Sequence, residues 1–299
     1  MVDKPGSTKG KAIPINWNKI PWWAVIVAAI FLFIINAVIT NPSYLDTLSF
    51  LSGYTMWITR GAVTGVVLTI VITIVAYVIT LVIGLIMGLA RLSKNPIIYT
   101  IATLYVEIAR GVPMLVLLLY VSFVGIPMVI SWTNSLGATM LAWTWLPGFL
   151  HGFAQALVDY NIRNVSEIVR GVIGLSIGYG AYSAEVFRAG IQSIEKGQME
   201  AARSLGMSYF QAMRFIILPQ AIRRILPPLG NDFIALLKDS SLVSALSVQE
   251  LTMLGRQNVA RTFRTFETWN MVALLYLIMT FALSFLVRQI ERRMSIEHR

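Results

Sequence analysis

The sequence predicts an all-α integral membrane protein, and two observations lead to this fold class. Charged residues make up only 13% of the 299 residues and the mean hydropathy is +0.71, whereas soluble domains carry about 25% charged residues. Four stretches contain no charged residue and exceed the roughly 20 residues that cross a bilayer. They are 20–45, 61–90, 111–158 and 268–287.

Six spans follow from these stretches and from two further apolar stretches that contain a few charges. The expected spans are 22–40, 62–90, 97–124, 166–187, 222–247 and 269–289. The first span follows a basic lead (1–21), is long and lacks a closing small-residue cleavage site. We therefore predict an extra N-terminal transmembrane helix rather than a signal peptide.

The positive residues indicate how the spans are oriented. Sixteen of the 24 Lys and Arg residues precede the first span, follow the second, lie between the fourth and fifth, or follow the sixth, and six lie on the other side. Because cytoplasmic loops are enriched in Lys and Arg, both termini are expected in the cytoplasm. This topology explains the net charge of +10 without nucleic-acid binding.

Several kinds of chemistry are excluded by residue types. The chain has no Cys, and His151 and His298 are too few for a histidine-based metal cluster, so we predict no metal site and no catalytic residue. The segment 6–12 is a poor phosphate loop because it has three spacer residues instead of four and Ala12 replaces the Ser or Thr that would hold Mg²⁺. The chain alone is expected not to hydrolyse ATP.

Two G-x-x-x-G patterns lie in expected spans. Gly84 and Gly88 form the first, and Gly174 and Gly178 form the second. Small residues at this spacing let two helices approach closely. The patterns fit packing within one chain and an interface between subunits equally well.

The connection between the fourth and fifth spans (188–221) is long and contains the most specific motif. The motif reads Glu200-Ala201-Ala202-x-x-x-Gly206, followed after nine residues by Ile216-x-Leu218-Pro219. This segment resembles the signature loop of ATP-binding-cassette (ABC) importer permeases. Further similarity to the polar amino-acid uptake branch of that family lies in 107–113, 185–191, 218–221, 227–231 and 237–242, and the similar regions together span about 61–124 and 165–293.

The resemblance implies a type I ABC importer permease fold. Its five-helix core is expected within 61–293, with the N-terminal helix and outer loop (22–60) as an addition and 294–299 as a cytoplasmic tail. In this family the motif forms a coupling helix that docks into a groove on a separate ATPase. The residues that carry this role over to the present sequence are Glu200, Ala201, Ala202, Arg203 and Gly206.

The resemblance also implies partners and a location. The expected partners are two ABC ATPase subunits, a second permease that is identical or paralogous, and an extracytoplasmic solute-binding protein. ATP and Mg are used by the ATPase, and no cofactor is expected in this chain. The expected location is the bacterial cytoplasmic (inner) membrane, and the expected cargo is a polar amino acid, with acidic, amide and basic side chains all open.

The segment 125–164 is longer than the short outer connection that the family leads us to expect. It contains several Trp residues together with Pro147 and Gly148. We predict an outer interfacial or re-entrant segment, because Pro interrupts a helix and Trp favours the membrane interface. The alternative, one more crossing within 136–158, would expel the basic segment 188–224 from the cytoplasm.

Charged residues inside expected spans are the candidates for substrate binding. Such charges are costly unless they are paired or face water. One reading is an interhelical salt bridge, and Glu107 and Arg110 can pair across one helical turn. The other is recognition of a zwitterion, in which a cation binds the α-carboxylate and an anion the α-ammonium. The candidates are Glu107, Arg110, Glu185, Lys238, Asp239 and Ser240, with Asp232 as a further buried charge.

Two other classes of protein also have several spans and buried charges. An ion channel or a secondary transporter would not require the coupling motif and its spacing. A purely structural membrane subunit, which contributes half of a transporter without a ligand site, also fits the sequence. Charges that face protein packing rather than a cavity would favour this last reading.

Overall fold

The computed structural model describes residues 39–53, 64–143, 145 and 147–294, together with residues 29, 32, 35 and 36. The expected basic lead (1–21), most of the first span and the end of the tail lie outside the described residues. The chain divides into two compact units, 1–46 and 47–299. The helix α2 spans their boundary, and the later elements belong to the second unit.

The described elements are helical apart from one isolated β-bridge between Gly65 and Glu250, which confirms the all-α prediction. Two of them, η2 and η4, are π-helical turns, and η3 and η5 are 3₁₀-helices. The elements are α2 (Pro42–Leu51), α4 (Gly65–Ala90), α5 (Pro96–Gly111), α6 (Met114–Tyr120), η2 (Val121–Gly125), α7 (Ile126–Leu141), α8 (Gly148–Asp159), η3 (Ile162–Asn164), α9 (Glu167–Gln192), α10 (Lys196–Ser204), α11 (Tyr209–Ala212), η4 (Met213–Ile217), α12 (Leu218–Asp239), η5 (Ser240–Leu246), α13 (Leu251–Thr262) and α14 (Thr265–Met294).

Local sequence explains where two of the helices begin. The Asn95 side chain accepts a hydrogen bond from the backbone N–H of Ile97 at 2.9 Å, and proline follows at the first position of α5. The Ser166 hydroxyl accepts from the backbone N–H of Val169 at 3.3 Å at the start of α9. Both residues satisfy an amide that a helix N-terminus leaves without an intrahelical partner.

Close approach of α4 and α9 settles the role of the G-x-x-x-G patterns. A Cβ added at Gly84 would lie 2.6 Å from the Cβ of Ser183, and one at Gly174 would lie 2.7 Å from the Leu118 side chain. The first pattern therefore packs α4 on α9, and the second packs α9 on α6. Both serve packing within one chain.

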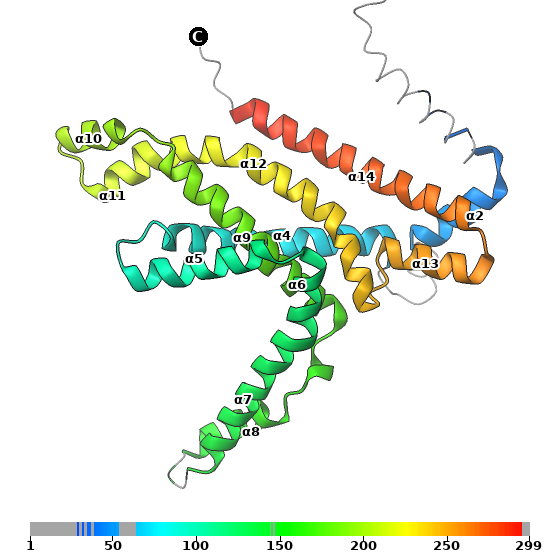
Figure 1. The fold of residues 1–299 in the computed structure, drawn as a ribbon, viewed down its shortest axis with the longest axis horizontal. Helices are drawn as coiled ribbons and strands as arrows, with labels where there is room; N and C mark the ends of the chain where they lie inside the picture. The colour runs from blue at the N-terminus through cyan, green and yellow to red at the C-terminus, as the bar shows by residue number, and fades with distance from the viewer. Residues whose placement is uncertain are drawn as a thin grey trace, which may run out of the picture. The chain divides into compact units, whose positions relative to one another are not determined.

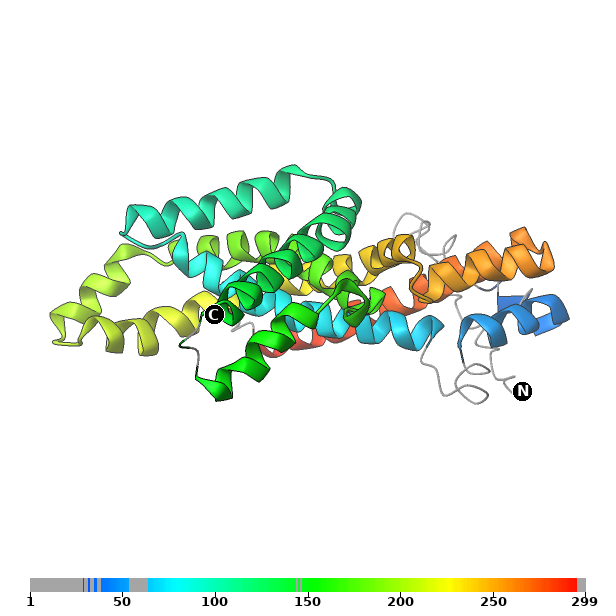
Figure 2. The same ribbon diagram turned by 90° about the horizontal axis from the view of Figure 1, so that it is seen from below.

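The helices α4 and α9 run in parallel, which fixes the path between them. Val172 shares a buried cluster with Ile72 near the start of both helices, and Ser183 meets Gly84 further along both. The intervening segment must therefore return to the starting end of α4 before α9 begins. Both views place α10 and α11 at one end of α9 and α12, and α13 at the other (Figure 1, Figure 2).

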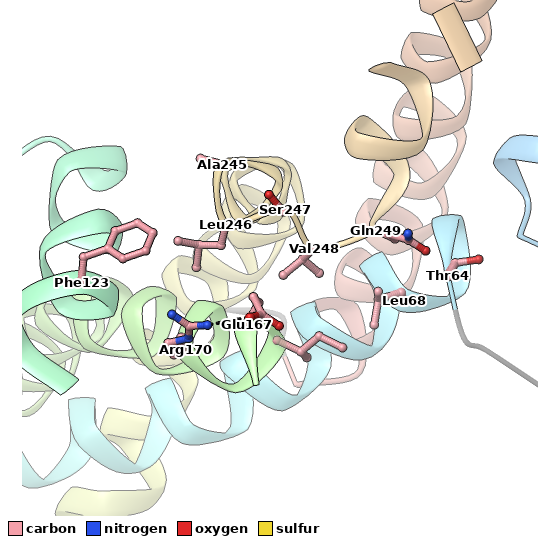
Figure 3. Close-up of a pocket in the computed structure, with 11 residues that line it drawn as sticks. Thr64, Leu68, Phe123, Glu167, Arg170, Ala245, Leu246, Ser247, Val248 and Gln249 are labelled. Atoms are coloured by element: carbon pink, nitrogen blue, oxygen red, sulfur yellow. Dashed lines mark hydrogen bonds and ion pairs between the residues drawn. The ribbon is translucent and has the colours of Figure 1, made fainter. Parts of the chain in front are cut away.

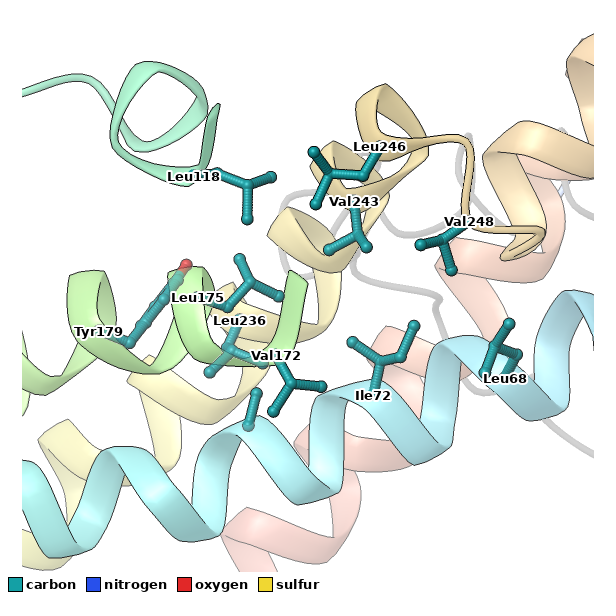
Figure 4. Packing of buried hydrophobic residues seen from close by; sticks show 11 residues of the cluster. Leu68, Ile72, Leu118, Val172, Leu175, Tyr179, Leu236, Val243, Leu246 and Val248 are labelled. Carbon is teal, nitrogen blue, oxygen red and sulfur yellow. The ribbon is translucent and has the colours of Figure 1, made fainter. Parts of the chain in front are cut away.

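Among the described residues, a large buried cluster lies between α4, α9 and α12, towards the end at which α4 begins (Figure 4). Leu175 and Leu236 are fully buried in it, and Leu118 enters from α6. Val243 and Leu246 of η5 cover the cluster from the end of α12. The apolar faces of these separate helices thus hold the core that positions the candidate site.

The third expected span, 97–124, is wrong as a single helix. The helix α5 ends at Gly111, Val112 is extended, and a continuous helix then runs through α6, η2 and α7 from Met114 to Leu141. Pro113 causes the break because it has no N–H to donate and disfavours a helical conformation at the preceding residue.

Pro219, the last residue of the motif, does not end a helix. The helix continues from α11 through the π-helical turn η4 into α12, and Pro219 lies in the first turn of α12. A wider π turn accommodates a residue that cannot donate an intrahelical hydrogen bond. The fifth span ends as an α-helix at Asp239 rather than 247 and continues as the 3₁₀-helix η5.

Three helices within the described residues are long and apolar enough to cross a membrane: Gly65–Ala90, Met114–Leu141 and Thr265–Arg292. The helices α9 and α12 contain 26 and 22 residues, which also reaches across a bilayer core, but both carry charges. A helical membrane protein is confirmed, whereas the number of six spans stays a prediction.

The inserted segment forms a helical hairpin of α7 and α8. A Cβ added at Gly137 would lie 2.7 Å from the carbonyl oxygen of Ala154, and the Asn134 amide donates to the carbonyl oxygen of Val158 at 3.1 Å. Residues between Leu141 and Gly148 interrupt the helix, so no regular span covers 136–158. The hairpin runs across the direction of α4 and α9 in both views (Figure 1, Figure 2).

A buried glutamate at the start of α13 joins this helix to α14. Glu250 is fully buried and accepts hydrogen bonds from the backbone N–H groups of Thr252 and Met253 and from the hydroxyl of Tyr276, each at 2.9 Å. Burial raises the pKa of this carboxyl above its ordinary value, and the hydrogen bonds offset only part of that rise. The sequence analysis predicted neither α13 nor this network.

Candidate functional site

The predicted coupling segment is an exposed helix between α9 and α12. Glu200, Ala201 and Arg203 are exposed on α10, whereas Ala202 is only 4% exposed and faces the protein. The three exposed residues therefore lie on the outer face of the helix. The predicted segment coincides with a helix that has a free face.

The end of α10 has the geometry of a Schellman motif. The N–H of Met207 donates to the carbonyl oxygen of Ala202 at 3.2 Å, and the N–H of Gly206 donates to that of Arg203 at 3.0 Å. Gly206 has φ +80, in the left-handed region that glycine adopts without a steric penalty. Gly206 therefore ends α10.

Large apolar side chains are exposed around this helix end. Leu205 is 84% exposed and Phe210 79% exposed, and Tyr209 and Phe215 are exposed beside them. Sequence reasoning placed only the motif residues here. The signal that it missed is the pair of aromatic residues Tyr209 and Phe210, which begins three residues after the helix-ending glycine.

A buried cluster anchors α10 to the long helices. Ile194 before α10 packs with Ile217 and Ile225, and Met199 of α10 packs against the same cluster. Gly190 of α9 lies so close to Ile225 of α12 that a Cβ there would overlap its side chain. The exposed helix is therefore attached to α9 and α12 by close packing.

Ion pairs join the residue that caps the end of α4 to the second halves of α5 and α9. Arg91 contacts Glu185 at 2.6 Å and Glu107 at 3.7 Å, and Arg188 forms a further ion pair with Glu185. Glu107 thus pairs with α4 instead of with Arg110. For Glu185 the geometry favours the interhelical salt bridge over a ligand contact.

A second group of candidates forms a row across three helices. The Arg110 guanidinium of α5 lies 5.5 Å from the centroid of the Tyr182 ring, which lies 6.0 Å from the ring of Tyr179. The Tyr179 hydroxyl donates to Asp239 of α12 at 2.8 Å. A cation and an anion are thus connected through two tyrosine rings of α9.

The remaining candidates lie apart from this row. Lys238 is exposed and makes no ion pair within the described residues, and Ser240 is buried with its hydroxyl donating to the carbonyl oxygen of Leu237 at 2.7 Å. Asp232 accepts a long hydrogen bond of 3.5 Å from Ser183. The structure therefore links Arg110 to Asp239 only through Tyr182 and Tyr179, and it links Glu107 to Glu185 through Arg91.

Sequence reasoning missed the residues that link these candidates. Arg91 was treated only as a topology signal, and Tyr179 and Tyr182 were not singled out. Their spacing of three residues puts both rings on one face of a helix, which was the available signal. The partner helices could not be deduced from spacing alone.

The fold and this site define a class of protein, the permease subunits of ABC importers. Residues 165–296 match the family described as the binding-protein-dependent transport system inner membrane component. The chain is 36% identical over 196 residues to the glutamine transport system permease protein GlnP of Escherichia coli (strain K12). The matched region covers 66% of this chain and 75% of GlnP.

Other comparisons agree in sequence and in structure. The arginine ABC transporter permease protein ArtQ of Escherichia coli (strain K12) is 32% identical over 192 residues, 63% of this chain and 75% of ArtQ. A solved structure described as an amino acid ABC transporter with histidines is 35% identical, with a TM-score of 0.62 over 83% of this chain and 98% of that chain. The chain therefore belongs to the binding-protein-dependent inner membrane components, and it is a membrane-spanning permease subunit of an ATP-driven importer.

Proposed function

We propose that this permease moves a polar amino acid into the cytoplasm by alternating access. The observation that carries the proposal is the row from Arg110 to Asp239, because it presents a cation and an anion on different helices of a chain that belongs to an importer family. A free amino acid carries the complementary pair of charges. The amino-acid names of the similar permeases support the same class of cargo.

We propose that α10 is the coupling helix of this importer. Its exposed face with Glu200 and Arg203, and the apolar side chains of Leu205 and Phe210, form a surface suited to a groove on a separate ATPase subunit. ATP and Mg act in that partner. Because α10 is packed onto α9 and α12, movement of the ATPase would be transmitted to both helices.

The proposed topology places α10 in the cytoplasm and the α7–α8 hairpin on the outer side. The parallel course of α4 and α9 supports it, since the segment between them must cross back once. The hairpin is uncharged up to Val158 and exposes Trp132, Trp145 and Phe149. This composition suits the outer membrane interface, where Trp is enriched.

The working complex in this proposal contains two permeases, two ATPase subunits and a solute-binding protein outside the membrane. The test is to reconstitute the complex in liposomes and to measure which of the twenty L-amino acids drive uptake and stimulate ATP hydrolysis. Uptake of one or a few polar amino acids is expected, with no hydrolysis by the isolated chain. Uptake of none of them would refute the proposed cargo, and robust hydrolysis by the pure chain would refute the assignment of ATP to a partner.

A further inference from the structure

A cavity of about 630 Å³ lies at the end of the bundle where α4 and α9 begin, and Figure 3 shows the residues that line it. It is formed where α4 and α9 begin, beside η2 and the segment that follows η5. Phe123, Leu246 and Val248 give it apolar walls, and Ser247 and Gln249 add polar groups. Cavities that bind small ligands typically measure about 300–1,000 Å³, so this one is of ligand size.

One ion pair lines this cavity. Glu167 and Arg170, one turn apart on α9, are joined by a hydrogen bond of 2.7 Å between Oε1 and Nη2. The Arg170 side chain is 13% exposed, whereas the Glu167 side chain is 56% exposed. The cavity thus presents a largely buried cation and an accessible anion side by side (Figure 3).

Arg170 has hydrogen-bonding capacity that the described part of the chain does not use. A guanidinium has five N–H donors, but the bond to Glu167 is the one that it makes here, and its buried Nε has no partner. A buried donor without an acceptor is unfavourable. An anionic ligand in the cavity would supply the missing acceptors.

We propose that this cavity is an outer capture site for the zwitterionic head of an amino acid. Arg170 receives the α-carboxylate, a group whose two oxygens match the planar guanidinium. The carboxylate of Glu167 accepts from the α-ammonium, and the wall formed by Phe123 and Leu246 contacts the carbon chain. The inference rests on the proposed function and adds a site separate from the row between Arg110 and Asp239.

An ordinary intrahelical ion pair gives a different expectation. If Glu167 and Arg170 only stabilise the first turns of α9, their charges can affect stability, but they cannot make the cavity distinguish an amino acid from a derivative without the carboxylate. The test therefore measures this distinction.

The experiment uses the permease–ATPase complex in lipid nanodiscs without the solute-binding protein. Because the chain has no Cys, Ala245→Cys places one thiol at the edge of the cavity, and the rate of its alkylation by a charged maleimide is measured. The probes are the L-amino acid with the highest uptake by the wild-type complex and the α-carboxamide of the same amino acid. Ser135→Cys, on the hairpin, is the control thiol outside the cavity.

The expected result is specific to the carboxylate. At about ten times its dissociation constant the amino acid should slow labelling of Ala245→Cys about tenfold, because the unoccupied fraction falls as 1/(1 + [L]/Kd). The carboxamide should protect far less, and neither probe should protect Ser135→Cys. Adding Arg170→Gln should weaken binding about tenfold or more and so cut protection to about twofold or less.

Matched variants separate binding from folding. Arg163→Gln removes an exposed arginine that does not line the cavity and should leave protection intact. Should Arg170→Gln fail to assemble, Glu167→Gln replaces it: protection by the amino acid should fall while that by its N-acetyl derivative, which lacks the ammonium, should not change.

Three results would overturn the site: equal protection by the amino acid and its carboxamide, protection unchanged by both Arg170→Gln and Glu167→Gln, or uptake without any protection of Ala245→Cys. The last result would leave the proposed function standing. Absence of uptake in the wild-type complex would instead refute the proposed function and this site with it.

Discussion

Gly206→Ala is the sharpest test of coupling through α10. Gly206 has φ +80, and a Cβ added there would meet nothing within 4 Å. The substitution therefore introduces backbone strain without a steric clash. We expect it to disfavour the Schellman motif that ends α10 and to leave the rest of the chain unchanged.

The size of the effect follows from the left-handed conformation. An L-residue in that region costs about 1–2 kcal/mol relative to glycine, which lowers the population of the capped helix end about 5- to 30-fold. Gly197 provides the matched control, because it lies in α10, has no positive φ, and also has nothing within 4 Å of an added Cβ. Alanine at 197 should stabilise the helix by up to about 1 kcal/mol.

The assay compares transport per ATP hydrolysed in reconstituted complexes. Gly206→Ala should lower this ratio and weaken binding of the ATPase subunit, Gly206→Asn should do so less because Asn tolerates the left-handed region, and Gly197→Ala should behave as wild type. Expression and membrane insertion should be equal in all variants. If Gly206→Ala couples as well as Gly197→Ala, the end of α10 does not transmit the movement and the coupling role is wrong.

Three further predictions address packing, pH and topology. Gly84→Ala should destabilise the chain by about 1–3 kcal/mol in thermal unfolding, because its Cβ would meet Ser183. Gly152→Ala should not destabilise the chain, because the space around Gly152 is open. Equal unfolding midpoints of the two variants would contradict the packing of α4 on α9. Burial raises the pKa of Glu250, so the protonated carboxyl is favoured in the folded chain. The contribution of Glu250 to folding stability is therefore fully present at pH values below its ordinary pKa of 4.5, and it is lost as the pH rises through the raised pKa. Unfolding midpoints should therefore fall over that window in wild type and not in Glu250→Gln, and a parallel fall in both would refute the assignment. In single-Cys variants, Ser135→Cys should react with an impermeant reagent outside intact cells and Ser193→Cys only after permeabilisation; labelling of the latter from outside would overturn the proposed orientation.

The sequence predicted the long helices because their lengths and apolar composition are local properties. The helices α4, α9 and α14 lie where uncharged or apolar stretches placed them, and the segment around Gly206 is a helix end as its motif indicates. The third span failed because a single X-Pro step, Val112-Pro113, breaks an otherwise apolar stretch. The helix α13 was missed because it is short and carries charges, which hide it from a search for apolar length.

The pairing of charges could not be predicted for a different reason. Glu107 and Arg110 have a spacing that allows a pair on one helix, but Arg91 of α4 competes for Glu107 and the ring of Tyr182 lies under Arg110. These neighbours come from other helices. A single sequence gives the spacing within a helix and leaves the arrangement between helices undetermined.

The placement of the two tyrosines connects α10, the proposed coupling helix, to the candidate ligand site. Tyr179 and Tyr182 belong to α9, whereas Arg110 belongs to α5 and Asp239 to α12. The helix α9 leads into α10 and is packed against α4 over its length. In the proposed coupling, a displacement of α10 by the ATPase would therefore move the two tyrosines together with α4. Any movement of α9 relative to α5 or α12 then changes the contact with Arg110 or the 2.8 Å hydrogen bond to Asp239. The same helix therefore leads into α10 and carries both tyrosines of the charged row. This is the arrangement that the proposed coupling requires if movement of an ATPase is to alter how a zwitterion is held.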